Sequence, residues 1–129
     1  MDGRIMPTEQ ECNLDLAKLY EELYNTDTAR FVHECYTTDC EVNGGFIRGH
    51  EQFDKVESAV LAAAPNRIMR VARRHASGNV VVVEAVLLDP DQGPDWKIPF
   101  CAVLTCRDGK IASDWTYADF TNWPGITDL

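Results

Sequence analysis

The spacing of apolar residues predicts helices in the first half of the chain. Residues 13–24 carry apolar side chains at the i, i+3, i+4 and i+7 positions of one helix face, namely Leu16, Leu19, Tyr20 and Leu23. Asp27 is suited to cap a second, shorter helix that ends near Tyr36. A third helix is expected to begin near Glu51 and to end just before Pro65.

Strands are predicted between the second and third helices and throughout the second half of the chain. Residues 40–47 are expected to form a short hairpin, because Asn43-Gly44-Gly45 supplies residues that tolerate positive φ. Strand periodicity then predicts a consecutive antiparallel meander, at residues 68–76, 79–88, 96–106 and 110–118. Helices followed by such a sheet define an α+β fold, in which the sheet can curl around the helices and enclose a pocket.

The strand at residues 79–88 is apolar on both faces, which changes the picture of the sheet. Its sequence VVVVEAVLL does not alternate apolar with polar residues. Helices cover one face of such a sheet, so apolar residues on both faces require a second cover. A homodimer packed sheet against sheet is the simplest one. The alternative is that β-branched residues are present only because they favour strands.

Length and composition limit the classes of function. A chain of 129 residues is expected to form one domain, spanning residues 1–129. The formal net charge of −9 disfavours nucleic acid and anionic membranes as partners. The chain contains no apolar run long enough for a membrane span and no secretory pattern at its N-terminus, so a soluble cytoplasmic protein is expected. Five cysteines without CxxC spacing indicate reduced thiols rather than disulfides or a metal site.

Several motifs, taken in their order and spacing, resemble the SnoaL-like group of the nuclear transport factor 2-like superfamily. They are Tyr20 with Asn25, Asp39-Cys40-Glu41-Val42, Ile47-Arg48-Gly49-His50-Glu51, and Asp108-Gly109-Lys110-Ile111 followed by Trp115, Tyr117 and Asp119. The group includes ketosteroid isomerase, limonene epoxide hydrolase and polyketide cyclases. The resemblance covers about residues 12–122. It implies a cone of three helices and a strongly curved mixed or antiparallel sheet around a central apolar cavity, and a homodimer through the outer sheet face.

The catalytic residues of these relatives are only partly present. Tyr20 stands where the isomerases have a tyrosine that donates a hydrogen bond to an oxyanion. Their general base falls at Gly44, beside Asn43, and their second acid falls on Ala102, so the isomerase mechanism is disfavoured. Neither an acid nor a base stands at the three places that the epoxide hydrolases use, namely Ala85, Leu87 and Thr116.

Asp114 is the remaining candidate for an acid or base. It lies two residues before Thr116, so a strand period of two puts both on one face, which the resemblance turns toward the cavity. A carboxylate in an apolar wall would have a raised pKa and could act opposite Tyr20 as hydrogen-bond donor. The alternative is a solvated Asp114 at the mouth of the cone, or one tied to Arg70, Arg73 or Arg74.

The other polar and aromatic candidates also have structural explanations. His33, His50 and His75 fall on a polar helix side, at a helix start and before a turn. Cys40 and Cys101 are typical of core thiols. Trp123 is expected either to cover the cavity or to pack across a dimer interface. The expected substrate-binding residues are Asn43, Phe46, Val83, Ala85, Leu87, Phe100, Ala102, Thr116 and Trp123; no cofactor or metal is expected.

Two functional hypotheses follow. The first is a cofactor-independent isomerase, cyclase or hydrolase that moves protons on a small apolar, oxygen-bearing molecule with Tyr20 and Asp114. The second is a non-catalytic ligand-binding or assembly domain of the same fold, because three places that carry catalytic residues in relatives lack them here.

Overall fold

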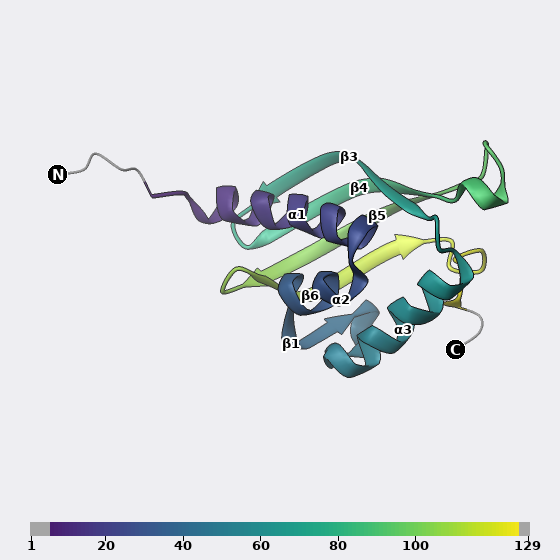
Figure 1. Ribbon diagram of the computed structural model, residues 1–129. Helices are drawn as coiled ribbons and strands as arrows, with labels where there is room; N and C mark the ends of the chain where they lie inside the picture. Colours follow the sequence, from purple (N-terminus) through teal and green to yellow (C-terminus); the bar gives the residue numbers. More distant parts are fainter. Residues whose placement is uncertain (1–5, 127–129) are drawn as a thin grey trace.

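Three helices and a six-stranded sheet make up the part of the chain that the structure describes (Figure 1). The structure is a computed structural model, and it describes residues 6–126. Residues 1–5 and 127–129, at the two ends of the expected domain, lie outside the described residues. The α+β class predicted from the sequence is confirmed.

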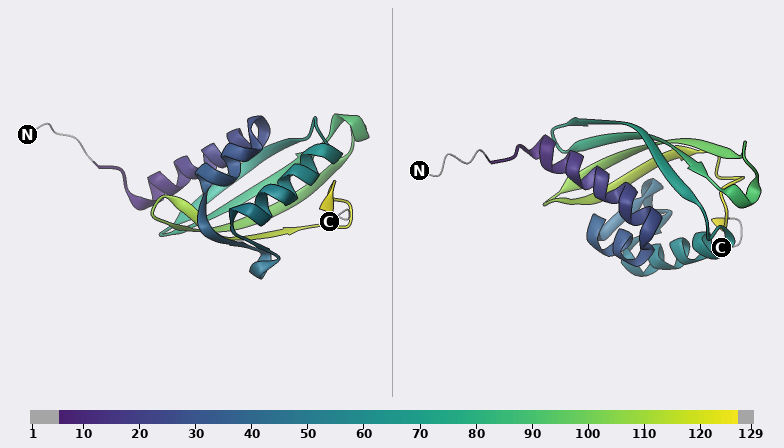
Figure 2. Two further views of the ribbon diagram at one scale, coloured as in Figure 1. Left: turned by 60° about the horizontal axis from the view of Figure 1, so that its bottom comes forward. Right: turned by 45° about the horizontal axis from the view of Figure 1, so that its top comes forward.

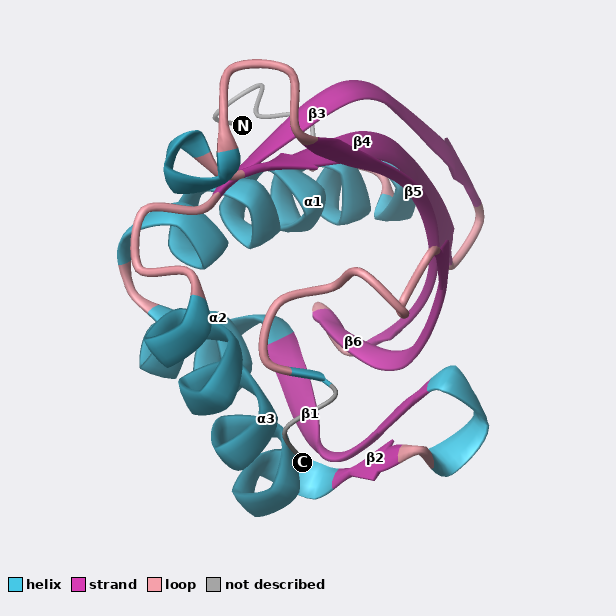
Figure 3. Cartoon of the chain, turned by 90° about the vertical axis from the view of Figure 1, so that its right-hand side faces the viewer, coloured by secondary structure: helices cyan, strands magenta, loops and turns pink. Residues whose placement is uncertain are grey.

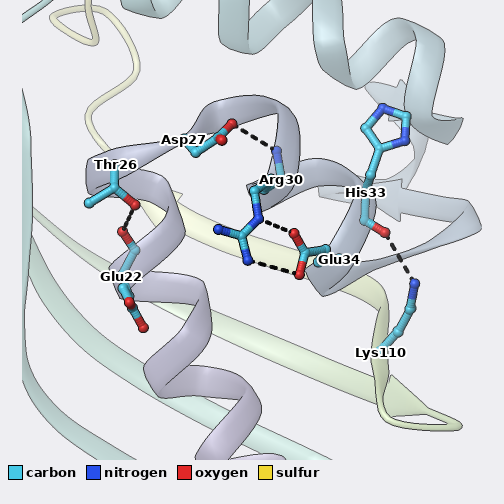
Figure 4. Close-up of polar contacts among 7 residues, drawn as sticks. All are labelled: Glu22, Thr26, Asp27, Arg30, His33, Glu34 and Lys110. Carbon is cyan, nitrogen blue, oxygen red and sulfur yellow. Dashed lines mark hydrogen bonds and ion pairs between the residues drawn. The ribbon is translucent and has the colours of Figure 1, made fainter.

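The three helices begin and end close to the predicted positions. They are α1 (Glu9–Thr26), α2 (Thr28–Cys35) and α3 (Gly49–Ala63). Asp27 caps α2 as predicted, because its carboxylate accepts a hydrogen bond from the backbone N–H of Arg30 at 3.2 Å. Figure 4 shows this cap together with the ion pair between Arg30 and Glu34. Within residues 6–126, none of the helices has the length and apolar character needed to cross a lipid bilayer.

The sheet is mixed, with strand order β2-β1-β6-β5-β4-β3. The strands are β1 (Tyr36–Val42), β2 (Ile47–Arg48), β3 (Ile68–Ser77), β4 (Val80–Leu88), β5 (Lys97–Arg107) and β6 (Lys110–Ala118). The predicted meander from β3 to β6 is antiparallel throughout. The predicted hairpin is also present as β1 and β2, but β1 begins at Tyr36 and pairs in parallel with β6. This long-range pairing has no local sequence signal.

The sheet is strongly curved, and the three helices lie on its concave side (Figures 2 and 3). α1 packs chiefly on β3, while α3 packs on β1 beside α2. The segment after β6 runs back toward α3 (Figure 3). Gly125 allows this close approach: its φ is +79°, and a Cβ there would lie 2.5 Å from the carbonyl oxygen of Ala59 in α3.

An irregularity in β6 decides which of its side chains face the helices. The β5–β6 register shifts where Thr105 pairs with Ser113 but Cys106 pairs with Ile111, which leaves Ala112 as an extra residue. Such a bulge reverses the alternation of side chains along the strand. As a result Ile111 and Asp114 are both buried, although they lie three residues apart.

The outer face of the sheet is open in this single chain and largely apolar on β4, β5 and β6, although Glu84 of β4 pairs there with Arg73 and His75 of β3. On β4, the inward residues are buried and the outward ones are half-buried. Outward residues form rows across the strands, with Val82 beside Val103 and Val103 beside Trp115. Trp115 and Tyr117 are 45% and 61% exposed, and their rings stack with centroids 6.4 Å apart. The second face that the sequence predicted to be apolar is therefore present.

Asn25 connects the end of α1 to β3, and its removal is expected to destabilise the fold. Its amide donates to the carbonyl oxygen of Met69 at 2.8 Å and accepts from the N–H of Met69 at 2.7 Å. We expect Asn25→Ala to lower the free energy of unfolding by about 1–3 kcal/mol, because two backbone groups lose their partner. Urea unfolding measures this. Asn66→Ala, which removes an exposed side-chain bond to Asp91, is the control, and an equal effect would contradict the prediction.

Candidate functional site

A cavity of about 330 Å³ lies between the helices and the concave face of the sheet. This volume is suited to a small organic molecule. Most of its lining is apolar and much of it is aromatic: Tyr20, Tyr24, Phe31, Tyr36, Phe46, Phe53, Phe100, Phe120 and Trp123. Only a few polar groups reach it besides the tyrosine hydroxyls: Asn43, Glu57, Asp114 and Thr116.

Asp114 is buried in the wall of this cavity, with 3% of its surface exposed. The Tyr36 hydroxyl group donates a hydrogen bond to Oδ2 at 2.6 Å, and the Thr116 hydroxyl group donates to Oδ1 at 2.7 Å. The alternative of a solvated or arginine-bound carboxylate does not hold. Arg73 pairs with Glu84, Arg74 pairs with Glu21, and Arg70 is exposed; among the described residues none of the three pairs with Asp114.

The surroundings of Asp114 favour its protonated form more than water does. Burial raises the pKa of the carboxyl group, and the hydrogen bonds from Thr116 and then Tyr36 partly offset this effect by favouring the charged form. A carboxylate held in this way is a stronger base than an exposed one, because it gains more from taking up a proton.

Aromatic packing fixes the direction of the Tyr36 hydroxyl group. Tyr36 is the first residue of β1 and directly follows α2. Its ring contacts Phe31 with centroids 5.3 Å apart and Phe53 with centroids 4.7 Å apart, both edge to face. Burial, followed by the charge of Asp114, raises the pKa of Tyr36 well above its ordinary value. Tyr36 therefore stays protonated and serves as a hydrogen-bond donor.

Tyr20 reaches the same cavity from α1. Its residue is 3% exposed, and its ring packs against Phe31 with centroids 5.3 Å apart. Burial and then the charge of Asp114 raise the pKa of Tyr20 well above its ordinary value. Within residues 6–126, no protein group forms a hydrogen bond with the Tyr20 hydroxyl group. The proton of Tyr20 is thus available to a ligand.

The turn after β1 positions Thr116 rather than supplying a base. Asn43, with φ at +50°, accepts a hydrogen bond from the N–H of Thr116 through Oδ1 at 2.7 Å. At Gly44, where the isomerase base falls by resemblance, φ is +70° and a Cβ would lie 2.8 Å from the Trp115 ring. A side chain at residue 44 would be strained and would clash.

Glu57 of α3 is a second carboxyl group at the cavity. Burial raises the pKa of Glu57 to about 7; the positive charge of Arg67 lowers it and the charge of Asp114 raises it further. Its Oε2 atom is closed off from solvent and has no hydrogen-bond partner among the described residues. Arg67 forms its hydrogen bonds with Tyr24 instead of Glu57: its Nε donates to the Tyr24 hydroxyl oxygen at 3.2 Å.

The segment after β6 covers one side of the cavity. Phe120, Trp123 and Ile126 all contribute to the lining. The Trp123 ring packs edge to face on Phe100, with centroids 5.5 Å apart, and lies at the same distance from Phe120. Of the two placements expected for Trp123, the structure has the one at the cavity.

The structure brings together most of the residues expected at the site, but not all. Tyr20 and Asp114 line one cavity, as do Asn43, Phe46, Phe100, Thr116 and Trp123. Four expected substrate-binding residues are placed elsewhere, within the buried core on the inner face of β4 and β5, namely Val83, Ala85, Leu87 and Ala102. The physical reason is that an inward side chain near α1 meets other core side chains instead of open space.

The remaining sequence candidates lie outside the cavity. His33 is exposed and pairs with Asp54, and His75 is exposed and pairs with Glu84. His50 contacts the backbone carbonyl oxygen of Tyr36 through Nε2 at 2.9 Å. Cys40 is buried, Cys101 is half-buried, and all five cysteines are free. Within residues 6–126, no cluster of His, Cys, Asp and Glu side chains could hold a metal ion.

The sequence analysis did not anticipate Tyr24, Tyr36 or Glu57 at the cavity. Tyr36 was expected only as the end of a helix, and no local signal indicates that it faces Asp114. Glu57 had a signal. It occupies the position between Val56 and Val60 on the apolar face of α3, where helical spacing calls for an apolar residue.

Comparisons with known proteins agree with this architecture. A family model described as a SnoaL-like domain matches residues 16–114. A comparison with curated protein sequences finds no match.

Solved structures share the fold at low sequence identity. A protein from Jannaschia sp. CCS1, assigned as a SnoaL-like polyketide cyclase, is 16% identical with a TM-score of 0.75; the match covers 92% of this chain and 93% of that one. IdmH from Streptomyces antibioticus, assigned as a polyketide cyclase, is 18% identical with a TM-score of 0.73, over 85% and 94% of the two chains.

A third structure comes from Catenulispora acidiphila DSM 44928 and has a ketosteroid isomerase-like fold in complex with trimethylamine. It is 18% identical with a TM-score of 0.73, over 84% of this chain and 88% of that one. Identities this low establish the fold alone. The family model, however, matches most of the sequence itself, so the chain belongs to the SnoaL-like domain family.

Proposed function

We propose that this protein is a cofactor-independent enzyme that performs proton-transfer chemistry on a small, largely apolar, oxygen-bearing molecule. Isomerisation, cyclisation and water addition are the reaction types in this class. The observation that carries the proposal is the buried Asp114, which lines an aromatic cavity together with an unpaired Tyr20 hydroxyl group. Two of the similar structures are assigned as polyketide cyclases, which supports the same substrate chemistry.

The geometry supports a simple sequence of proton transfers. A substrate carbonyl oxygen would accept a hydrogen bond from Tyr20, while the Asp114 carboxylate takes a proton from the neighbouring carbon. The C–H bond breaks, its electron pair forms an enolate, and the charge that develops on oxygen is stabilised by Tyr20. Asp114 then returns the proton to another atom of the product. Tyr36 holds the carboxylate in place by donating to Oδ2.

Binding without catalysis is the second candidate, and one observation favours it. Each oxygen of Asp114 already accepts a hydrogen bond from the protein, which is also what a purely structural carboxylate requires. In that case the cavity would hold a ligand, and Asp114 would only stabilise the wall. Replacement of Asp114 distinguishes the two candidates.

Asp114→Asn is expected to abolish proton transfer while the fold survives. The amide keeps the size of the side chain but cannot take up a proton. With 2-tetralone as probe, we expect the wild type to accelerate exchange of the α-protons with deuterated water, and the variant to lose at least about a hundredfold of this rate. Proton NMR measures the exchange.

Asp39→Asn is the matched control, because Asp39 is exposed and pairs with Arg107. Its exchange rate should equal that of the wild type. If Asp114→Asn retained full exchange, the catalytic proposal would be wrong. The binding role would be supported if Asp114→Asn bound the probe within about 1 kcal/mol of the wild type and neither the wild type nor Asp114→Asn catalysed exchange.

Tyr36→Phe is expected to move the acid limb of the pH–rate profile to higher pH. The Tyr36 hydrogen bond lowers the pKa of Asp114, so its loss raises that pKa, and the base becomes protonated at a higher pH than in the wild type. Exchange rates measured across the pH range test this. Tyr117→Phe, on the outer face, should leave the limb in place. An unmoved limb in Tyr36→Phe would show that Asp114 is not the titrating base.

We also propose that the protein forms a homodimer through the outer sheet face and works in a reducing cytoplasm. The apolar rows on β4, β5 and β6 and the exposed rings of Trp115 and Tyr117 support the dimer. The free state of all five cysteines agrees with the location.

Tyr117→Glu is expected to convert this dimer into a folded monomer. The new charge would be buried against the partner sheet without a counter-charge, which costs several kcal/mol. Light scattering after size exclusion measures the mass, and Ser77→Glu, at the exposed end of β3, is the control. A monomeric wild type, or a dimeric Tyr117→Glu, would contradict the proposal.

A further inference from the structure

Glu57 breaks the apolar face of α3 without any partner in the protein. Phe53, Val56 and Val60 on this face are buried, and Glu57 lies among them. Glu57 itself is half-buried, its Oε2 atom is enclosed, and neither oxygen of its carboxyl group forms a hydrogen bond or ion pair with another described residue. A carboxyl group in apolar surroundings without a partner is unfavourable, so this group needs an explanation.

The nearby cation does not supply that explanation. Arg67 is buried, but its guanidinium group lies over the Tyr24 ring at 4.5 Å from the centroid and donates to the Tyr24 hydroxyl and carbonyl oxygens. Among the described residues, no carboxylate lies within ion-pair distance of Arg67. Arg67 therefore influences Glu57 only through its electric field, and no described residue forms a hydrogen bond with the Glu57 carboxyl group.

The unused group borders the same cavity as Asp114 but comes from the helix layer. Asp114 projects from β6, and Glu57 comes from α3, which the segment after β6 approaches. No hydrogen bond joins the two carboxyl groups within residues 6–126. The cavity thus has one carboxyl group in its sheet wall and another in its helix wall.

We propose that Glu57 is a specificity-determining residue that accepts a hydrogen bond from a hydroxyl group of the substrate. The substrate class is then an apolar ring compound with a carbonyl group near Tyr20 and Asp114 and a hydroxyl group at its other end. This inference rests on the proposed function for the carbonyl end of the molecule. A hydroxyl group suits the position better than an ammonium group, because Arg67 already places a positive charge near Glu57.

The affinities of three matched probes test the inference. The probes are 2-tetralone, 6-hydroxy-2-tetralone and 6-methoxy-2-tetralone, of which only the second can donate a hydrogen bond from its far end. We expect the wild type to bind the hydroxy probe about tenfold more tightly than the methoxy probe. Glu57→Leu should bind both equally. Isothermal titration calorimetry measures the affinities, and Glu51→Gln, exposed on the same helix, should keep the preference.

The pH dependence of the preference provides a test that needs no variant. Raising the pH through about 7 ionises Glu57, and the carboxylate accepts a hydrogen bond more strongly than the acid. The hydroxy-over-methoxy ratio should therefore rise between about pH 6 and pH 8. The other ionisable groups here besides Arg67 are Asp114, Tyr20, Tyr24 and Tyr36. Glu57→Gln controls for their titration, because it keeps these groups and removes only the Glu57 carboxyl group. In Glu57→Gln the ratio should not depend on pH.

The outcomes separate this inference from the proposed function. Equal affinities in the wild type, a ratio that falls as the pH rises, or no binding of the hydroxy probe at its solubility limit would overturn the role of Glu57. A hydroxyl preference without exchange of the α-protons would leave Glu57 in place and remove the catalytic proposal. Exchange of the α-protons without a hydroxyl preference would keep the catalytic proposal and remove the role of Glu57.

Discussion

The hydrogen bond from Tyr36 to Asp114 is the contact on which the site depends. It joins residues 78 positions apart. It exists because β1 pairs in parallel with β6, which places Tyr36 opposite Ile111, three residues before Asp114. Burying a carboxylate in an aromatic cavity is costly unless its oxygens receive hydrogen bonds. Tyr36 and Thr116 supply one to each oxygen. The same two bonds that make the burial tolerable also orient the carboxylate.

The cavity lies in the fold of the SnoaL-like family, but its polar groups do not follow the isomerase pattern that the resemblance implies. At residue 44, where the resemblance to the isomerases places their base, this chain has a glycine, and a Cβ there would meet the ring of Trp115 on the outer face. Instead, the acidic groups stand on β6 and α3. Catalysis on a shared fold depends on which side chains reach the cavity, so these differences matter more than the overall likeness.

Much of the fold could be predicted from the sequence, whereas the site could be predicted only in part. Period-two segments and Gly-containing turns located β3 to β6 within one or two residues, since these signals are local. Asp114 was singled out from its strand position, and it lines the cavity; its role as an acid or base stays a prediction. A strict alternation from the buried Ile111, however, would turn Asp114 outward, and only the extra residue at Ala112 turns it inward. The core positions of Val83, Ala85, Leu87 and Ala102 were mistaken for cavity positions for a similar reason, because an inward direction does not reveal what a side chain meets.

The sequence by itself determined the helices, the meander, the apolar residues on the outer face of the sheet and the few ionisable groups on apolar segments. These depend on residue propensity and on periods of 2 and 3.6, which act over a few neighbours. Only the tertiary structure decided the parallel pairing of β1 with β6, the partners of Asp114 and the unpartnered state of Glu57. Each of these depends on which residues from distant parts of the chain come together. That is set by how the curved sheet packs on the three helices, and not by neighbouring residues in the sequence.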